Sequence, residues 1–362
     1  MKVMLSGATA GTNFGDLLFA KMFQQHISEQ IGEENVFWYS TRFSMSSFFK
    51  NSLNYSREGK TKDMDALVYV SGGYFCGDDK NLRDRILRVL RYFVVGLKCN
   101  FHKIPYCIIG LEVSDPKNKW LRWIEKKVLR DADLIVVRNH ESIKCLESYG
   151  IDNAIETVDS AFSIESTLFE HIELPEDIKL CSKKILLLHI NPGVGSNDNI
   201  KSRIVPIINT FLQQHKEYAV LVTADQYVDA QKDAVDDVCK QLKCDTVLRY
   251  YYSDPIALCK VIDRVDTIVT HKLHVGLVGA RLGKSVISFS GHTEKIERLY
   301  KQLDASERST ALRDLDFETG VKILEKYYDK PINVSDLIIS QAKSNFVFLS
   351  NFLDDVKKEL QS

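Results

Sequence analysis

The stretch Asp266-Thr-Ile-Val-Thr-His-Lys-Leu-His-Val-Gly276 decides the fold class. Its first half is a short apolar run rich in β-branched residues, which predicts a buried strand. It then passes directly into a segment of helical period, in which Gly276 and Gly279 allow the helix to approach its neighbours closely. A strand that runs straight into a helix is the repeating unit of parallel α/β sheets.

The same alternation extends along the chain in both directions. Expected strands cover residues 3–6, 36–39, 66–70, 106–110, 134–137 and 155–158, then 184–189, 219–223, 246–250, 267–270 and 285–289. Helical patterns separate them, at about 82–99, 120–129, 142–149, 202–215, 230–242, 255–264, 273–282 and 294–303. We therefore expect two Rossmann-like, doubly wound α/β domains in a GT-B-like arrangement, with an inter-domain cleft.

The domain boundaries follow from the length and from where the pattern lapses. A chain of 362 residues favours two domains at about 150 residues each. The alternation lapses in a polar stretch, which predicts an N-terminal domain over 1–165, a linker over 166–182 and a C-terminal domain over 183–330. Residues 331–362 form a final helix without a partner strand; in tandem arrangements of this kind such a helix can pack back on the first domain, and the sequence leaves this open.

Composition and charge exclude several classes of protein. The chain is 44% hydrophobic and 27% charged, with 18 Gly and 7 Pro, which excludes a collagen-like or largely disordered protein. Its 48 basic and 49 acidic side chains give a net charge of −1, so it lacks the global positive field of a generic nucleic-acid binder. Nucleic acid is therefore not an expected partner.

The cellular compartment is predicted from cysteine usage and from apolar runs. Eight cysteines without Cys-x-x-Cys spacing predict reduced, mostly buried thiols rather than disulfides or a zinc knuckle. The first seven residues reach Gly7 before a signal peptide's apolar segment is complete, and no run of 18 apolar residues follows. A soluble, cytoplasmic protein is the resulting expectation.

One region departs from the neutral balance. Residues 80–130 hold 13 Lys or Arg against 4 Asp or Glu, and the helix expected at 82–95 interleaves arginines with apolar residues. Basic amphipathic helices are attracted to anionic membrane surfaces, which suggests peripheral contact with the inner, cytoplasmic face of the membrane. The alternative is an ordinary helix, buried on one face and solvated on the other.

Two glycine-rich loops follow strands of the first domain. The first strand runs into Gly7, Gly11 and Gly15, spaced four apart just before a helix, and another strand ends at Gly72-Gly73. Such loops let backbone amides approach an anion or a sugar, and neighbouring strands would place both in one wall. The spacing matches neither dinucleotide-binding nor P-loop patterns. The alternative is a purely structural strand-to-helix turn.

Charged residues stand at further strand ends. Arg138 follows residues 134–137 and precedes a helix opening at Ser142, a combination that suits a carboxylate or phosphate; the alternative is pairing with a structural acid. Asp159 is either a ligand contact or a turn-former, and Lys295 adds positive charge at another strand end. The polar segment 40–62 is a candidate substrate loop or a surface excursion.

The histidines of the opening stretch carry the candidate chemistry. His271 and His274 flank Lys272 where the strand ends. Two histidines at this spacing can bind zinc, but no Asp, Glu or Cys nearby in sequence completes the ligand set, so no metal site is expected. General acid–base work by His274 is favoured, because imidazole titrates near neutral pH. For His271 we expect a core histidine bonded to the backbone.

Taken together, these residues resemble the polysaccharide pyruvyl transferase family. The matching segments, in family order over about residues 5–303, are Asn13-Phe14-Gly15-Asp16, Gly72-Gly73, Arg138-Asn139-His140-Glu141-Ser142, Asp159-Ser160-Ala161-Phe162 and Lys272-Leu273-His274. Three positions depart from the family pattern: Lys272 replaces an arginine, Asn139 an aspartate and Ser160 a proline. The resemblance implies a GT-B-like fold, phosphoenolpyruvate as donor, and a pyruvate ketal formed on a sugar of a surface polysaccharide such as a capsule or exopolysaccharide.

The resemblance also implies roles for residues. Arg138 and Lys272 would hold the donor's carboxylate and phosphate, Leu273 would pack beside it, and His274 would be the catalytic acid. We take Asp16 as the candidate base for the acceptor, a sugar of a lipid-linked oligosaccharide bound by the first domain, with the donor on the second. Further expected substrate-binding residues are Asn13, Gly15, Gly72, Gly73, Ser142, Asp159 and Lys295.

The reaction needs no nucleotide, flavin or metal, so no cofactor is expected. The fold alone equally permits a glycosyltransferase with a nucleotide-sugar donor, or a non-catalytic relative that binds a sugar or an anion.

Overall fold

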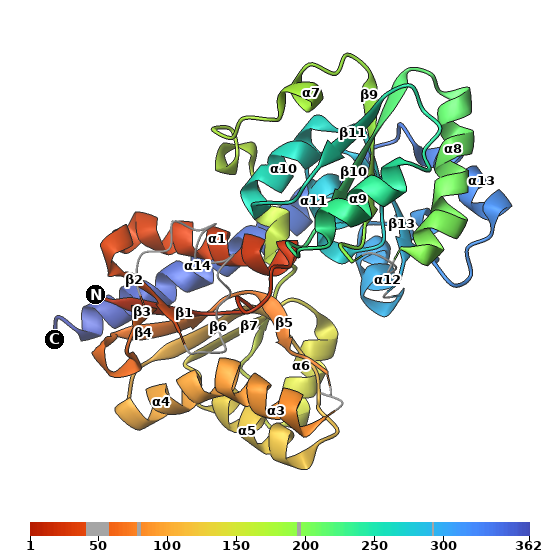
Figure 1. Cartoon of the computed structure of the whole chain (residues 1–362). Helices are drawn as coiled ribbons and strands as arrows, with labels where there is room; N and C mark the ends of the chain where they lie inside the picture. Colours follow the sequence, from red (N-terminus) through yellow and green to blue (C-terminus); the bar gives the residue numbers. More distant parts are fainter. Residues whose placement is uncertain (41–57, 78–80, 194–196, 292) are drawn as a thin grey trace. The chain divides into compact units, whose positions relative to one another are not determined.

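The computed structural model describes residues 1–40, 58–77, 81–193, 197–291 and 293–362, and it divides into two compact units. Unit 1 comprises Met1–Ser163 and Leu337–Ser362, and unit 2 comprises Ile164–Asp336 (Figure 1). The segment expected as a linker, residues 166–182, belongs to unit 2. The difference has a physical reason, since Phe169 and Ile178 are fully buried and make the segment part of a core. Most of the candidate substrate loop, residues 41–57, lies outside the described residues.

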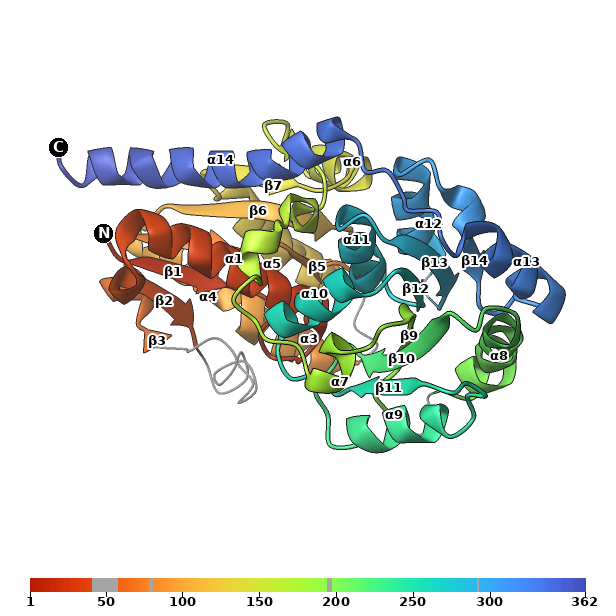
Figure 2. The same cartoon turned by 90° about the horizontal axis from the view of Figure 1, so that it is seen from above.

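Unit 1 is built on a parallel sheet. Its strands are β1 (Val3–Ser6), β2 (Val36–Tyr39), β3 (Glu58–Gly59), β4 (Ala66–Tyr69), β5 (Gly72–Phe75), β6 (Tyr106–Val113), β7 (Leu134–Val137) and β8 (Ile155–Glu156). They are ordered β3-β2-β1-β4-β6-β7-β8, with β5 paired to β6, and Figure 2 shows β1, β2 and β3 side by side. The chain moves from β1 to β2 on one side and later to β4 on the other. Ligands of open α/β sheets bind at such a reversal of strand order, beyond the carboxyl ends of the strands.

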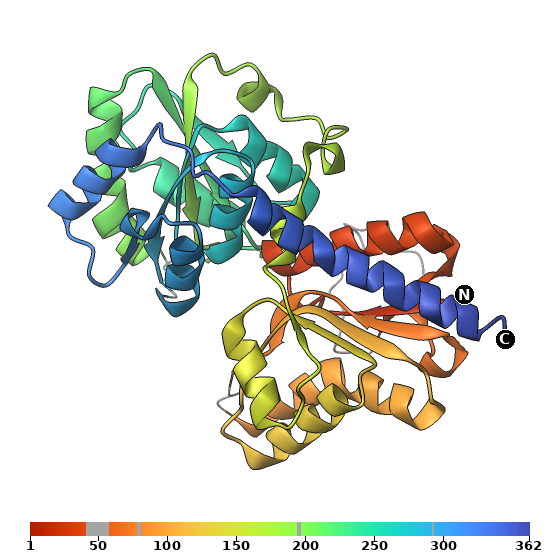
Figure 3. The same ribbon diagram turned by 180° about the vertical axis from the view of Figure 1, so that it is seen from behind.

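Helices cover both faces of this sheet. On one face lie α1 (Phe14–Ile31) and α14 (Asp336–Glu359); on the other lie α3 (Leu82–Arg88), η3 (Val89–Phe93), α4 (Val94–His102) and α5 (Lys119–Arg130), while α6 (His140–Ser148) follows β7 (Figures 1 and 3). The final helix packs directly on α1. The rings of Phe23 and Phe346 lie 4.9 Å apart, and His26 Nε2 is 2.9 Å from Ser350 Oγ. The chain therefore returns from unit 2 to complete the core of unit 1.

Unit 2 repeats this plan. Its strands are β9 (Lys184–Ile190), β10 (Tyr218–Ala224), β11 (Val247–Tyr250), β12 (Thr267–Thr270), β13 (Ser285–Ser290) and β14 (Ser309–Ala311), ordered β11-β10-β9-β12-β13-β14. Its helices are α7 (Glu176–Lys179), α8 (Val205–Gln214), α9 (Gln231–Cys239), α10 (Pro255–Arg264), α11 (Leu273–Arg281), α12 (Thr293–Gln302) and α13 (Phe317–Tyr327). This is the strand order of the dinucleotide-binding Rossmann fold, and it places the reversal between β9 and β12. Both units are thus Rossmann-like and doubly wound.

The alternation of β9 determines which residues face the helices on each side. Leu186, Leu188 and Ile190 belong to the core that α8, α9 and α13 cover. Because side chains alternate along a strand, Leu187 and His189 point to the opposite face. A fully buried histidine therefore lies near the carboxyl end of the central strand.

A bulge at Gly110 redirects the end of β6. The pairing of β6 with β7 shifts register between Ile109 and Leu111, and Gly110 has φ +68°. Leu111 and Val113 consequently face the core beneath α4 and α5, and Glu112 points away from it. If β6 kept strict alternation with the same residues, Glu112 would instead point into that apolar core. The bulge is thus what makes the carboxylate available at the strand end.

The structure gives the state of the cysteines and the character of the helices. All eight cysteines are free, and four of them are buried: Cys99, Cys107, Cys239 and Cys259. Within the described ranges, no helix combines the length and the apolar character required to cross a bilayer.

The Gly110 bulge leads to a stability prediction. Gly110→Ala should destabilise unit 1 by about 2–4 kcal/mol, because the residue has positive φ and an added Cβ would collide with the Ser71 hydroxyl. Gly77→Ala is the matched control, since Gly77 also has positive φ (+86°) but an added Cβ meets nothing within 4 Å. That variant should lose only about 1 kcal/mol. Urea unfolding followed by tryptophan fluorescence reports on unit 1, which contains all three tryptophans. Equal losses in the two variants would show that the close approach is unimportant.

Candidate functional site

Each unit gathers polar side chains at the carboxyl ends of its strands. In unit 1 we call Ser71, Glu112, Arg138, Asp159 and Ser160 the arginine cluster. In unit 2 we call His189, Asn191, Asp225, His271 and Lys272 the histidine cluster. Both lie at strand ends where parallel α/β sheets hold ligands.

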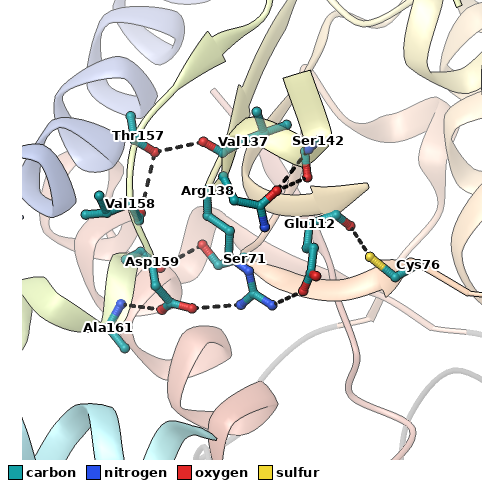
Figure 4. Close-up of polar contacts among 12 residues, drawn as sticks. Ser71, Cys76, Glu112, Val137, Arg138, Ser142, Thr157, Val158, Asp159 and Ala161 are labelled. Carbon is teal, nitrogen blue, oxygen red and sulfur yellow. Dashed lines mark hydrogen bonds and ion pairs between the residues drawn. The ribbon is translucent and has the colours of Figure 1, made fainter. Parts of the chain in front are cut away.

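Arg138 is held between two carboxylates. It directly follows β7, and its terminal nitrogens lie 2.5 Å from Glu112 Oε2 and 2.7 Å from Asp159 Oδ2 (Figure 4). The three side chains are only 7%, 8% and 10% exposed. Burial by itself would lower the pKa of Arg138, but the Asp159 and Glu112 carboxylates raise it above its ordinary value. The guanidinium is therefore permanently charged, and both of its ends bind acids.

From the sequence, Arg138 could either bind a carboxylate or phosphate of a ligand or pair with a structural acid. The structure shows the second arrangement, with two acids. Two carboxylates outweigh one guanidinium, so the cluster has a formal charge of −1 and offers a donor anion no net attraction. The pairing instead fixes the ends of β6 and β7 and the segment after β8 relative to one another. Contact between Arg138 and the donor stays a prediction, and the contacts seen here support a positioning role.

Hydroxyls and amides support the cluster. Ser160 Oγ donates to Ser71 Oγ at 2.7 Å, a bond that a proline at position 160 could not make. Asn139 Oδ1 accepts from the backbone N–H and the hydroxyl of Ser142, at 2.9 and 2.7 Å, as an aspartate there would. Both departures from the family pattern are thus accommodated. Ser142 itself is fully buried and also bonds the backbone of Val113, so we give it a positioning role rather than a substrate contact.

The last helix also reaches this cluster. Asn345 of α14 is fully buried, and its Nδ2 donates to the carbonyl of Val158 at 3.1 Å. Its Oδ1 accepts from the hydroxyl of Thr157 at 3.0 Å. These bonds fix the backbone that leads into Asp159. A residue near the end of the chain therefore positions one of the two carboxylates that bind Arg138.

The two glycine-rich loops of unit 1 lie beside each other, because they follow the neighbouring strands β1 and β4. In the first turn of α1, Asn13 Nδ2 donates to Asp16 Oδ2 at 3.0 Å. A Cβ added to Gly72 would lie 3.9 Å from Asp16 Oδ1, so this carboxylate lies close to the second loop. Gly15 is buried in α1, and Gly73 is half-buried in β5. The sequence had predicted a loop at Gly72 and Gly73, where the structure has this strand. We call Asn13, Asp16, Gly72 and Gly73 the glycine wall.

The histidine cluster centres on Asp225, which directly follows β10. Its Oδ1 lies 3.3 Å from His189 Nε2 and its Oδ2 lies 3.6 Å from Lys272 Nζ. The Asp225 side chain is 3% exposed, whereas that of Lys272 is 24% exposed. Burial raises the pKa of Asp225, but the neighbouring His189 and Lys272 side chains outweigh this and bring the pKa of the carboxyl below its usual range. A buried carboxylate therefore anchors a cation that reaches the surface.

His271 is a core histidine bonded to the backbone, as expected. Its Nδ1 lies 3.2 Å from the carbonyl of His189, its Nε2 lies 2.7 Å from Asn191 Oδ1, and its ring stacks on that of His189 at 4.6 Å. Burial and the neighbouring His189 charge hold the pKa of His271 well below its usual value, so the ring is neutral at pH 7. A neutral ring has one N–H, which the carbonyl requires at Nδ1. Nε2 then accepts a hydrogen bond from the side-chain amide nitrogen of Asn191. This assignment flips the Asn191 amide, so that its nitrogen rather than its oxygen faces the ring.

The candidate acid lies at the start of α11. Lys272 is the N-cap of this helix, and Leu273 and His274 form its first turn, all three half-buried. Amide hydrogens in a first helical turn lack acceptors inside the helix, and the helix dipole favours negative charge there. Lys295 is exposed near the start of α12. No cluster of three or more His, Cys, Asp or Glu suited to a metal ion occurs in the part of the chain that the structure describes.

A family model named polysaccharide pyruvyl transferase matches residues 13–293. This match covers both clusters and most of the chain. The chain belongs to the polysaccharide pyruvyl transferase family. No curated protein matches the sequence of this transferase significantly.

Solved structures agree with the fold of the pyruvyl transferase. A UDP-GlcNAc 2-epimerase from Neisseria meningitidis has a TM-score of 0.62 at 13% identity, covering 98% of this chain and 100% of the epimerase. MnaA of S. aureus, solved with UDP, has a TM-score of 0.63 at 11% identity, covering 98% and 97%. MurG of Acinetobacter baumannii has a TM-score of 0.52 at 10% identity, covering 99% of each chain. At these identities the likeness shows the GT-B-like fold and nothing further.

The sequence analysis did not include Glu112, His189, Asn191, Asp225 or Asn345 among the site residues. Two of them had signals: Asp225 directly follows an expected strand, and a histidine in the apolar run 184–190 is unusual. Glu112 had none, because the strand was expected to end at residue 110, before the bulge brings the carboxylate to Arg138. Asn345 lies mid-helix in a polar stretch, far along the chain from its partners.

The buried pairing of Arg138 leads to a second stability prediction. Arg138→Met should lower the free energy of unfolding of unit 1 by about 3–5 kcal/mol, because Glu112 and Asp159 would be left buried without their cation. Lys127→Met is the control, since the Lys127–Asp131 pair at 3.2 Å is exposed and should contribute less than about 1 kcal/mol. Urea unfolding at pH 7 measures both, and a loss below about 1 kcal/mol for Arg138→Met would contradict the role given to it.

The neutral His271 leads to a pH prediction. Its folded-state pKa is lowered, so below pH 6.5 the unfolded chain binds a proton that the folded protein does not. The stability of unit 2 should fall by up to about 1.4 kcal/mol per pH unit as pH drops from 6.5. Hydrogen exchange of β9 and β12 amides, corrected for intrinsic rates, measures this slope. His271→Gln should reduce the slope and the exposed control His171→Gln should not; an unchanged slope in His271→Gln would show that another group titrates.

Proposed function

We propose that this protein transfers pyruvate from phosphoenolpyruvate to a sugar of a surface-polysaccharide precursor and forms a cyclic ketal. The observation that supports this most is the position of Lys272, Leu273 and His274 in a member of the pyruvyl transferase family. They lie where β12 passes into α11, beside β9, at the reversal of strand order in unit 2. A cation, an imidazole and a helix N-terminus at one strand end suit a small anion that must be protonated.

Lys272 and α11 supply the attraction for the donor. Phosphoenolpyruvate carries a carboxylate and a phosphate, so its site needs fixed positive charge. The Lys272 ammonium group lies 3.6 Å from Asp225, beyond hydrogen-bond distance, and is partly exposed. Asp225 therefore orients the ammonium group without enclosing it, unlike the two acids at Arg138. A lysine is a point charge rather than a planar fork, so donor geometry depends more on this orientation than it would with arginine.

The proposed chemistry balances without a cofactor. A sugar hydroxyl attacks the central carbon of phosphoenolpyruvate while His274 protonates the methylene carbon, which becomes the methyl group. The bond from the central carbon to the phosphate oxygen then breaks, and phosphate departs with the bonding pair. A second hydroxyl of the same sugar adds to the resulting oxocarbenium-like carbon and closes the ketal. Of the two hydroxyl protons, one restores His274 and the other leaves with phosphate.

The glycine wall of unit 1 is the proposed acceptor site. Its glycines let backbone approach a sugar closely, and Asp16 supplies a carboxylate that can accept a hydroxyl proton. Asn13 orients this carboxylate through its bond to Oδ2, which leaves Oδ1 toward Gly72. We propose a sugar of a lipid-linked oligosaccharide as the acceptor.

A nucleotide-sugar transferase is the second candidate, and a specific observation favours it: structures of the same fold are named with UDP-GlcNAc or UDP. Isothermal titration distinguishes the two. Binding of phosphoenolpyruvate but not of UDP supports pyruvyl transfer, and the reverse supports the second candidate. Incubation with phosphoenolpyruvate and lipid-linked glycans, followed by mass spectrometry, should show a pyruvyl increment with release of phosphate. Donor binding without release would indicate a non-catalytic relative.

The role of His274 is tested by kinetics. His274→Ala should keep the affinity for phosphoenolpyruvate within about tenfold and lose turnover by at least about a hundredfold, as expected on removal of a general acid. His171→Ala, which changes an exposed histidine of the same unit, is the control and should keep full turnover. Titration calorimetry and phosphate release measure the two quantities. Turnover equal to that of the unaltered protein would exclude His274 from the mechanism.

A further inference from the structure

The solvent face of α5 combines tryptophans with positive charge. The helix reads Lys-Trp-Leu-Arg-Trp-Ile-Glu-Lys-Lys-Val-Leu-Arg over residues 119–130. Lys119, Trp120, Trp123 and Lys127 share one side of it, because these positions fall within about a third of a turn around the axis. We call these four residues the α5 face. Trp120 is 43% exposed and Trp123 is 64% exposed, although a tryptophan is usually largely buried.

The core does not need these tryptophans. The opposite side of α5 supplies the buried residues Leu121, Ile124, Val128 and Leu129, which pack into the core beneath the helix. The α5 face is thus additional to an already complete amphipathic helix. Two large indole rings exposed to water have an unfavourable hydration free energy, and they add nothing to the stability of the fold. This indicates that they contact something else.

The neighbouring helix continues this surface. α4 and α5 lie side by side on the same face of the sheet (Figure 1), and Asn100 Nδ2 donates to Asp131 Oδ2 at 2.7 Å where both helices end. Phe101, next to this bond, is 82% exposed. At the start of α3, in the same layer of helices, Leu82 is 64% exposed. Apolar side chains therefore protrude at several points of the same layer of helices.

The charge of this layer is positive. α5 has five cations and one acid, and that acid, Glu125, is fully buried. The helical segment from α3 to α4 has five further Lys or Arg and one acid, Asp84, which bonds Asn81 at the helix start. Two acids lie beside α5: Asp131 is bonded to Lys127 and Asn100, and Asp115 is bonded to Arg122, so Lys119, Lys126 and Arg130 remain as the cations of α5 beyond these pairs. An approaching surface therefore meets cations around the tryptophans.

We propose that the α5 face docks unit 1 on an anionic lipid bilayer. Tryptophan prefers the headgroup region, where its ring is apolar and its N–H stays hydrated, and lysines around it attract anionic headgroups. A second copy of the chain is a poorer occupant, because pairing of two identical faces would bring like charges together. The helix first suspected from the sequence, residues 82–95, differs in that Phe93 and Val95 are buried in the core. The docking surface is the adjacent helix.

This inference does not depend on the donor or on catalysis. A lipid-linked acceptor would gain from a docked enzyme, but vesicle binding requires neither phosphoenolpyruvate nor turnover. Failure to bind vesicles would therefore leave the proposed function intact, and failure to bind phosphoenolpyruvate would leave the docking surface intact.

The test is sedimentation of the full chain with vesicles. One set contains equal parts of phosphatidylcholine and phosphatidylglycerol, and the other contains phosphatidylcholine alone. The unaltered protein should bind the anionic set, and added salt should weaken this binding. Trp123→Ser and the double variant Lys119→Glu/Lys127→Glu should each weaken it by at least about tenfold. Circular dichroism and urea unfolding check that the variants remain folded.

A matched control changes an exposed aromatic residue and an exposed lysine on unit 2. Phe317 is 50% exposed on α13 and Lys322 is exposed on the same helix, so Phe317→Ser/Lys322→Glu should bind vesicles like the unaltered protein. The proposal is overturned if the unaltered protein stays in the supernatant, if it binds both vesicle sets equally, or if the control loses binding to the same extent. It is also overturned if analytical ultracentrifugation shows a dimer that Trp123→Ser dissociates, because the α5 face would then join two copies.

Discussion

The buried contact of Arg138 with Glu112 and Asp159 is the constraint on which unit 1 depends. Three chain segments end there, and each contributes one charged group that would be costly to bury alone. The bulge at Gly110 turns Glu112 toward the guanidinium, and Asn345 of α14 fixes the backbone before Asp159. The strand ends of unit 1 are therefore held by a network of ion pairs as well as by apolar packing.

Unit 2 uses the same principle with a different degree of burial. Asp225 is as buried as the acids of unit 1, but its cation is Lys272, which is about one quarter exposed. The arginine cluster encloses its cation between two buried acids, whereas the histidine cluster holds a lysine that is partly exposed. This contrast supports the proposal that the donor binds to unit 2, although an arginine is usually the better anion ligand.

The sequence predicts much of this fold and less of the site. The bounds of β2, β7 and β12 were predicted to the residue, because each is a short β-branched or aromatic run with clear ends. The His271 assignment was also confirmed, since a histidine that ends a buried strand has a backbone carbonyl within reach. Glu112 and Asn345 could not be predicted, because their roles arise from a bulge and from contacts across long stretches of chain. Periodicity describes single elements, whereas charge pairing depends on which strand ends meet.

The position of α14 in unit 1 has a consequence for biosynthesis. Unit 2 is complete by Asp336, but unit 1 lacks Asn345 and the apolar side chains of α14 until this helix, too, has been synthesised. The segment made first is thus finished last, and the part of the sheet face that α14 covers beside α1 stays exposed during translation of the whole second unit. A nascent chain of this kind is open to chaperones in that interval, and a stop codon directly before Leu337 would leave unit 2 whole but impair unit 1.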